Sequence, residues 1–154
     1  MSHTTPIAST QAVPTRVAYQ GVPGCYSSAA VHRFFSGDSV EAISKHDFRS
    51  VFQSIVTGEV DYGMIPIENN LGGSIHTNYD YLQKFDVEIV AEHNFHIDHC
   101  LVATQPYTLE RLAKFPKVEV YSHPQALEQC RERLHGWGFT PCEYYDTAAA
   151  AIHR

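Results

Sequence analysis

The sequence has few charges, few basic residues and no long hydrophobic run. Of its 154 residues, 44% are hydrophobic and 18% are charged, which is the balance of a globular protein. No apolar stretch approaches the about 18 residues that a membrane helix needs, so we expect no membrane partner. The chain has 11 Lys and Arg against 17 Asp and Glu, a formal net charge of −6. It lacks the basic stripe that binds phosphate backbones, so nucleic acid is not an expected partner.

Cysteine pairs and glycine-rich cofactor motifs are also missing. The 4 cysteines contain no C-x-x-C pair. A globular chain of this length needs no disulfides, so we expect reduced thiols. Gly21 and Gly24 make only a G-x-x-G, and the Gly72-Gly73 pair lacks the Lys of a phosphate loop. We therefore expect no nucleotide or other organic cofactor.

One histidine-rich stretch has the spacing of a metal cluster: His93, His96, His99 and Cys100. On a strand, however, positions three apart lie on opposite faces, so these side chains cannot all converge. Strand histidines beside a buried cysteine are the simpler interpretation. We expect no metal site.

The first segment, residues 1–15, is rich in Ser, Thr, Pro and Gln and predicts a flexible tail. It lacks the hydrophobic core of a secretory signal. Its Ser and Thr content without acidic residues is similar to a transit peptide, but it is short and has no Arg before Arg16. The expected location is the cytoplasm, with a plastid as the alternative.

The rest of the chain alternates between strand-like and helix-like patterns. Expected strands span 16–20, 39–44, 62–67, 87–97, 100–104, 118–121 and 140–145. Expected helices follow an N-cap at Ser27 or Ser28, span 48–56 before Gly58, span 74–85, continue from Pro124 past Leu134, and open at Thr147. This alternation predicts an α/β fold with mostly parallel sheets and right-handed crossovers. Ligands bind such sheets beyond the carboxyl ends of the strands.

Small polar junctions stand at several of these strand ends, just before a helix. They are 21–27, 68–74, 122–125 and 146–147. Helix N-termini offer unpaired N–H groups, so together the junctions could hold a small dianionic or zwitterionic organic acid. The alternative is that their Ser and Thr residues only cap helices. Glu68 could be a general acid, if burial keeps its proton on, or a partner for backbone N–H groups.

The junctions belong to longer motifs that occur in the order typical of the prephenate dehydratase family, which this sequence resembles from Arg16 onward. The motifs are Ala18-Tyr-Gln-Gly-Val-Pro-Gly-Cys-Tyr-Ser27, Asp61-Tyr-Gly-Met-Ile-Pro-Ile-Glu-Asn69, Gly72-Gly-Ser-Ile75, Asp98-His-Cys-Leu101, Tyr121-Ser-His-Pro-Gln-Ala126 with Gln129, and Asp146-Thr-Ala148. The strings around Gly21 and Gly72 are more similar to the arogenate dehydratase branch of plants and algae.

The resemblance implies a two-lobed fold like the type II periplasmic binding proteins, with the first lobe at about 16–90, the second at about 91–154 and the active site in the cleft. The segment around 87–97 would cross between the lobes. The implied reaction is decarboxylative dehydration of prephenate to phenylpyruvate, or of arogenate to phenylalanine, in phenylalanine biosynthesis. The family needs no metal or organic cofactor, and its members commonly associate as dimers or tetramers.

The resemblance also assigns roles by position. Asn69, Ser122 and Gln129 would be catalytic residues that touch the substrate. The substrate-binding set would comprise Ser27, Glu68, Gly73, Ser74, Gln125 and Thr147. Gln125 and Gln129 are four apart on one helix, so both can turn to the same side. His123 is expected to stabilise the turn.

Two departures from the family pattern stand out. Asn70 replaces the usual Ser or Thr. The family also continues past the Asp-Thr-Ala helix to a strand, a returning helix, a Thr-Arg-Phe motif with the proton-donor Thr, and a regulatory ACT domain. We therefore expect a truncated product or an incomplete gene model, with marginal stability. Besides the enzyme, two alternatives remain: a non-catalytic module that binds an aromatic acid, and an interaction fragment that pairs with a longer chain.

Overall fold

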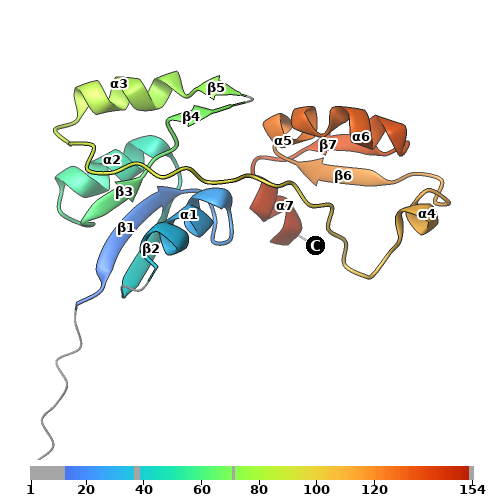
Figure 1. The fold of residues 1–154 in the computed structure, drawn as a ribbon, viewed down its shortest axis with the longest axis horizontal. Helices are drawn as coiled ribbons and strands as arrows, with labels where there is room; N and C mark the ends of the chain where they lie inside the picture. Colours follow the sequence, from blue (N-terminus) through green and yellow to red (C-terminus); the bar gives the residue numbers. More distant parts are fainter. Residues whose placement is uncertain (1–12, 37–38, 71, 153–154) are drawn as a thin grey trace, which may run out of the picture.

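The computed structural model describes residues 13–36, 39–70 and 72–152, and it has a mixed α/β fold with mostly parallel sheets (Figure 1). In chain order, the elements are β1 (Thr15–Gln20), α1 (Tyr26–Phe34), β2 (Val40–Lys45), α2 (Phe48–Val56), β3 (Tyr62–Met64), β4 (Glu68–Asn69), β5 (Gly73–Ser74), α3 (His76–Lys84), α4 (Leu109–Leu112), β6 (Glu119–Ser122), α5 (Pro124–Gln129), α6 (Arg131–Gly136), β7 (Thr140–Glu143) and α7 (Thr147–Ile152). Most of the expected tail lies outside the described residues, and Thr15 belongs to β1.

The N-terminal sheet has the strand order β2-β1-β3, with both neighbours parallel to β1. Because side chains alternate along a strand, the apolar run of β1 packs on both faces. Val17 and Tyr19 pack with Val31 of α1, whereas Ala18 packs with Val51 of α2. The central strand is thus covered by strands on two sides and by helices on two faces, as its apolar run predicts.

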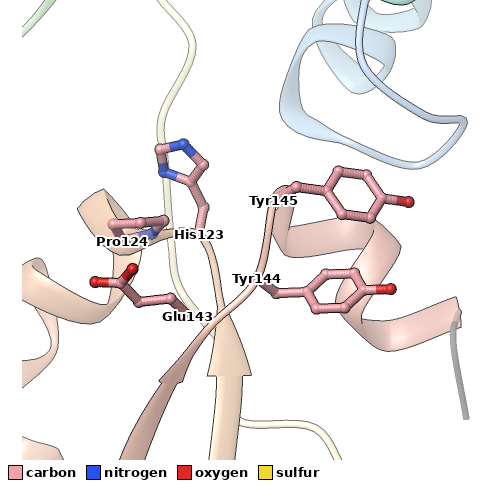
Figure 2. Close-up of a pocket in the computed structure, with 5 residues that line it drawn as sticks. All are labelled: His123, Pro124, Glu143, Tyr144 and Tyr145. Carbon is pink, nitrogen blue, oxygen red and sulfur yellow. The ribbon is translucent and has the colours of Figure 1, made fainter.

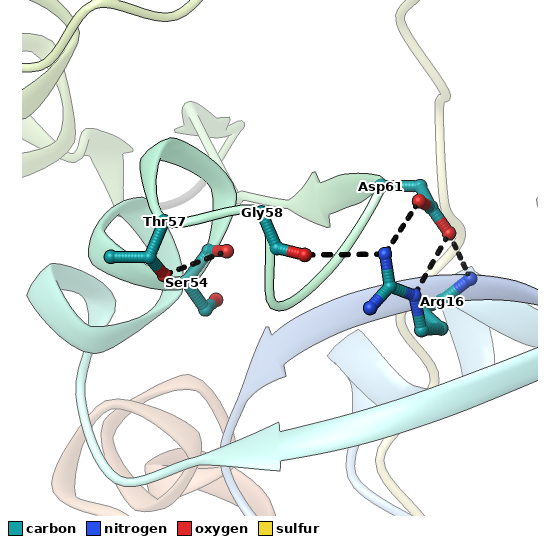
Figure 3. Close-up of polar contacts among 5 residues, drawn as sticks. All are labelled: Arg16, Ser54, Thr57, Gly58 and Asp61. Carbon is teal, nitrogen blue, oxygen red and sulfur yellow. Dashed lines mark hydrogen bonds and ion pairs between the residues drawn. The ribbon is translucent and has the colours of Figure 1, made fainter.

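A polar clamp joins the start of β1 to the loop before β3 (Figure 3). Arg16 Nη2 lies 2.9 Å from Asp61 Oδ1 and 3.3 Å from the Gly58 carbonyl oxygen. The Arg16 backbone N–H donates to Asp61 Oδ2 at 2.8 Å. Gly58 ends α2 at φ 71°, a left-handed conformation that favours glycine, as the sequence predicts for this position.

A short antiparallel hairpin, β4–β5, follows β3 and leads into α3. The expected strand over 62–67 ends early, at Met64, since Pro66 has no N–H to donate to a ladder. The Pro66 carbonyl instead accepts a 2.8 Å hydrogen bond from Nδ2 of Asn78, a fully buried side chain of α3. Asn78 therefore holds the turn that presents the hairpin.

The C-terminal sheet consists of the parallel pair β6 and β7. Leu127, Leu134 and Phe139 form its buried cluster, with Trp137 packed against it. The expected single helix after Pro124 is divided into α5 and α6 at Cys130, whose backbone (φ −100°, ψ 1°) departs from helical geometry. No helix in the described ranges is both long and apolar enough to cross a membrane.

The expected strands over 87–97 and 100–104 are wrong. Residues 86–104 run as an extended segment from the N-terminal to the C-terminal part, as the crossing connection implied by the family resemblance would (Figure 1). The β-rich composition is present, but a strand also needs a hydrogen-bonded neighbour, and no described strand pairs with this segment. Ile89, Val90 and Val102 are exposed as a result.

Candidate functional site

The carboxyl ends of β6 and β7 bring two predicted residues into direct contact. Ser122 is the last residue of β6 and is 9% exposed, and Thr147 is the first residue of α7 behind β7. Their hydroxyl oxygens lie 3.1 Å apart. The parallel register of the two strands causes this contact, because it puts both carboxyl ends at one edge. Both hydroxyls can also hydrogen-bond a ligand at this edge.

None of the predicted Ser and Thr residues caps a helix through its side chain. Ser27 and Ser28 lie inside α1, which begins at Tyr26 after the extended residue Cys25, and Ser74 lies in β5. His123 caps α5, because its Nδ1 accepts from the Gln125 N–H at 3.2 Å. His123 therefore stabilises the turn, as predicted. At α7 the Asp146 carboxylate accepts from the Ala149 N–H at 2.8 Å, so the capping alternative is wrong.

The β4–β5 hairpin lies against α5. Asn69 Oδ1 accepts from the Gly72 N–H at 3.3 Å, which ties the predicted catalytic amide to the tip of the hairpin. A Cβ atom added to Gly72 would overlap the side-chain amide of Gln125 and would come within 3.7 Å of the Asn69 Cβ. The added atom would thus meet the far end of the Gln125 side chain, which shows how close the hairpin tip comes to α5. Asn69 and Gln125 consequently lie near each other.

The loop after β1 meets the start of α7. Gly21 has φ 113°, and a Cβ atom there would lie 2.9 Å from Cys25 Sγ and 3.6 Å from Asp146 Oδ2. Burial raises the pKa of the Cys25 thiol, an effect that the backbone N–H groups of Ser28 and Ser27 partly oppose. Cys25 therefore stays a neutral thiol near pH 7 and is a poor nucleophile.

Two residues that were given no role from the sequence, Tyr26 and His99, link helix α1 to Gln129 of α5. The Tyr26 hydroxyl lies 2.8 Å from the Asp98 carbonyl oxygen and 3.1 Å from His99 Nδ1. His99 Nε2 lies 2.7 Å from Oε1 of Gln129, a predicted catalytic residue. The available signal was the Asp98-His-Cys-Leu101 string, which carries the family resemblance but was given no role.

Four predicted site residues make no described contact with the other predicted site residues on β6, α5 and α7. Ser27 is half-buried in α1, and no described contact joins it to Ser122 or Gln129. Glu68, Gly73 and Ser74 are exposed on the hairpin, where Glu68 pairs with Ser74 and Gly73 with Asn69 in the register. The burial that would make Glu68 a general acid is therefore missing.

The histidine-rich stretch sends its side chains to different partners. His96 lies 3.1 Å from Asp98 Oδ1, His93 packs edge-on against Phe34, and His99 joins Tyr26 and Gln129. Within the described ranges, no group of three or more His, Cys, Asp or Glu could hold a metal ion. The side chains at the Ser122–Thr147 edge are two hydroxyls, with the Asp146 carboxylate beside them as the cap of α7.

A shallow hollow of about 380 Å³ lies beside the same strand ends (Figure 2). It is lined by His123, Pro124, Glu143, Tyr144 and Tyr145, none of them a predicted site residue. The two tyrosine rings lie with centroids 4.7 Å apart, on the side of the hollow away from Glu143 and Pro124. Glu143 and the two tyrosines give this hollow a wall that is partly negative and partly aromatic.

Comparison with known proteins gives the site its context. The family model for prephenate dehydratase matches residues 17–154. The arogenate dehydratase/prephenate dehydratase 2, chloroplastic, of Arabidopsis thaliana is 41% identical over 88% of this chain and 34% of its own length. Arogenate dehydratase 2 of Petunia hybrida is 41% identical over 93% of this chain and 34% of its own length. The chain thus spans about one third of these curated relatives.

A solved structure described as GqqA, a novel type of quorum quenching acylase, is also similar. Its TM-score is 0.71 at 29% sequence identity, and the match covers 88% of this chain and 47% of that one. The likeness supports the α/β arrangement described above. Since the family model matches nearly everything from the middle of β1 onward, the chain belongs to the prephenate dehydratase family.

Proposed function

We propose that this chain binds prephenate or arogenate and takes part in their decarboxylating dehydration, to phenylpyruvate or phenylalanine, in phenylalanine biosynthesis. The observation that carries the proposal is the Ser122–Thr147 hydroxyl pair at the strand edge, in a chain of this family. Neutral donors that surround a small organic acid are what this reaction requires.

The reaction breaks two bonds of the cyclohexadiene ring. The ring hydroxyl leaves and takes up a proton to become water, and the electrons of the bond to the ring carboxylate enter the ring as carbon dioxide departs. Aromatisation supplies the driving force. The protein must hydrogen-bond or protonate the leaving hydroxyl, hold the side-chain carboxylate, and keep water away from the ring carboxylate.

The predicted residues can divide these tasks. In the proposal, Asn69, Ser122 and Gln129 contact the reacting ring. The approach of the hairpin tip at Gly72 to Gln125 of α5, the helix that follows β6, supports this assignment. Thr147 and Gln125 hold the acid from α7 and α5. Ser27, Glu68, Gly73 and Ser74 would reach the acid only if the ligand itself extends from the Ser122–Thr147 edge to α1 and the hairpin.

A second candidate function is binding of the acid without turnover. It is favoured by the same Ser122–Thr147 hydroxyl pair, because neutral hydroxyls can hold a carboxylate without transferring a proton to the ligand. Acyl-amide hydrolysis, suggested by the acylase likeness, is less well supported. Ser122 contacts the hydroxyl of Thr147, and no base is hydrogen-bonded to it in the described part of the chain.

The deciding experiment is an end-point assay of the purified chain with prephenate and arogenate separately, following phenylpyruvate and phenylalanine. Asn69→Ala is the test variant, and Asn70→Ala, the exposed neighbour, is its matched control. Turnover that Asn69→Ala loses and Asn70→Ala keeps would support catalysis and identify the substrate. A rise in melting temperature without product would support the binding candidate. Neither turnover nor a thermal shift would contradict both.

Location and assembly extend the proposal. We propose a plastid rather than the cytoplasm, because the Arabidopsis thaliana relatives are named chloroplastic.

We also propose self-association, because exposed apolar side chains such as Ile89 and Val90 would be covered in it. A fluorescent fusion in plant cells tests the first statement, and light scattering behind a sizing column tests the second.

A further inference from the structure

The hydrogen-bonded chain Tyr26–His99–Gln129 joins three segments that are distant in sequence. Tyr26 is the first residue of α1, His99 lies in the crossing segment, and Gln129 is the last residue of α5. The contacts span 73 residues from Tyr26 to His99 and 30 from His99 to Gln129. Such a chain fixes a side chain on α5 relative to the N-terminal helix.

We propose that Tyr26 and His99 are positioning residues that hold the Gln129 amide with its NH2 group free to donate to a carboxylate or hydroxyl of the bound acid. This inference rests on the proposed function for its ligand. Neither residue needs to touch the substrate, because each acts through Gln129.

The atoms in contact determine the direction of the amide. Gln129 Oε1 has no hydrogen, so the 2.7 Å contact with His99 Nε2 is a hydrogen bond only if Nε2 carries a proton. The carbonyl side of the amide is then occupied, and the NH2 side remains for a ligand. No other hydrogen bond of the Gln129 side chain occurs among the described residues.

Tyr26 supports the imidazole on its other side. Burial, reinforced by the nearby Cys100 and Asp98, raises the pKa of the Tyr26 phenol, so the hydroxyl keeps its one proton. The Asp98 carbonyl oxygen, at 2.8 Å, and His99 Nδ1, at 3.1 Å, both lie within reach of that proton. A neutral His99 that is protonated at Nε2 can only accept at Nδ1, so the inference requires that Tyr26 donates to Nδ1 rather than to the Asp98 carbonyl. The two rings also pack edge to face, with centroids 5.8 Å apart, and Phe95 packs on Tyr26 at 6.2 Å. The imidazole is thus held by ring packing and by hydrogen bonds at both nitrogens.

This arrangement explains why His99 differs from its neighbours. His96 has a side chain that is 80% exposed and pairs only with Asp98, so its ring is held on one side. His99 is half-buried and is held at both nitrogens. A hydrogen bond from a fixed donor is what keeps an amide from rotating by 180° and presenting its carbonyl instead.

The first test needs no substrate. The full chain with ¹⁵N-labelled histidine gives an imidazole spectrum in which the His99 signals are assigned by their loss in His99→Gln. We expect a protonated Nε2. An unprotonated Nε2 with a protonated Nδ1 would mean that the amide is reversed, and it would overturn the inference whether or not the chain has any activity.

The second test measures turnover or, if the chain only binds, the Kd for the acid. Tyr26→Phe keeps the ring packing but removes both hydrogen bonds, and His99→Leu removes the donor to Gln129. We expect kcat/KM or affinity to fall by about 10- to 100-fold in His99→Leu and by less in Tyr26→Phe. His99→Gln, which restores an N–H donor near the position of Nε2, should recover most of this loss, and His96→Gln should cause none.

A merely structural role would give a different pattern. The loss would then follow the melting temperature of each variant, and His99→Gln would be as impaired as His99→Leu, which would overturn the inference. If the unaltered chain neither binds nor converts either acid, the proposed function fails. The imidazole spectrum still decides whether His99 orients the Gln129 amide.

Discussion

The N-terminal and C-terminal sheets differ in how completely their strands are covered. In the N-terminal sheet, β1 has a strand on each side, and Val17 and Ala18 are fully buried on opposite faces. In the C-terminal sheet, β6 and β7 pair with each other, and the core residues retain 4–7% exposure. The first sheet supplies rigidity, while the second presents its strand ends to the candidate site. A strand that is covered on both faces, such as β1, becomes part of a closely packed core, whereas the uncovered strand ends of β6 and β7 remain accessible to a ligand.

The largest expected effect tests whether the two sheets unfold separately. Phe52 is 1% exposed and stacks on Phe85 at 5.5 Å, so Phe52→Ala should lower the free energy of unfolding of the N-terminal part by about 3–5 kcal/mol. The single Trp, Trp137, packs against Phe139 in the C-terminal part and reports on it alone. In urea, we expect the circular-dichroism transition to shift more than the Trp137 fluorescence transition.

Phe139→Ala is the matched variant in the other sheet. It should shift mainly the fluorescence transition, because Phe139 belongs to the cluster around Leu134. Identical shifts of both probes in both variants would contradict separate unfolding and would make the chain one cooperative unit.

The next effect concerns the contact between the two parts. Gly72→Ala places a methyl group where the Gln125 amide lies, so the flexible Gln125 side chain must turn away from the hairpin tip. We expect the affinity for the acid, or kcat/KM, to fall by up to about 100-fold, with little change in melting temperature. Gly136→Ala is the control, because a Cβ atom there meets nothing within 4 Å. Equal effects of the two substitutions would contradict the role of the hairpin contact.

A smaller effect sharpens the account of the N-terminal part. Asn78→Ala removes the partner of the Pro66 carbonyl in a fully buried place, and we expect it to cost about 1–3 kcal/mol of stability. Asn78 Oδ1 has no hydrogen-bond partner among the residues that the structure describes, so the amide contributes through its NH2 group. Tyr79→Ala, at the exposed neighbouring position, is the control. In urea unfolding, we expect it to lower the free energy of unfolding by less than Asn78→Ala does.

The smallest effect is the pH dependence of the Arg16–Asp61 clamp. The hydrogen bonds from Arg16 hold the pKa of the Asp61 carboxyl below its usual 3.8. A folded pKa below the unfolded one contributes stability that is present above 3.8 and is lost as the pH falls through the folded pKa. Asp61→Asn should therefore flatten the melting temperature between about pH 4 and pH 2. An unchanged acid limb would show that the clamp contributes nothing.

Much of the fold could be predicted from local patterns. The apolar run of β1, the stripe of α2 with its terminal glycine, and the strand before Pro124 are all where the sequence places them. The failures were at 87–104, at the ends of helices and at Cys130. At these places the local sequence had the β propensity or the helical spacing that we used. Whether a strand forms or a helix is capped also depends on a hydrogen-bond partner that the local pattern does not show.

The site residues named from the sequence stay predictions, and their contacts could not be predicted from the sequence. Ser122 and Thr147 stand where a strand ends or a helix begins, and parallel strands place such junctions at one edge, whereas Gln129 lies at the far end of α5. Tyr26 and His99 were not identified, because a hydrogen bond across 73 residues has no local signature. Glu68 was overestimated, since exposure on a hairpin cannot be read from the buried strand before it.

The sequence by itself determined the α/β class, the family and the small polar residues at the strand ends, because periodicity and motif order are local properties of a chain. Only the tertiary structure decided which of these residues meet. Ser122 pairs with Thr147 through strand register, and Gln129 is held by His99 and Tyr26 through the path of the crossing segment. Register and path depend on packing between distant segments, and that packing sets the direction in which each donor points.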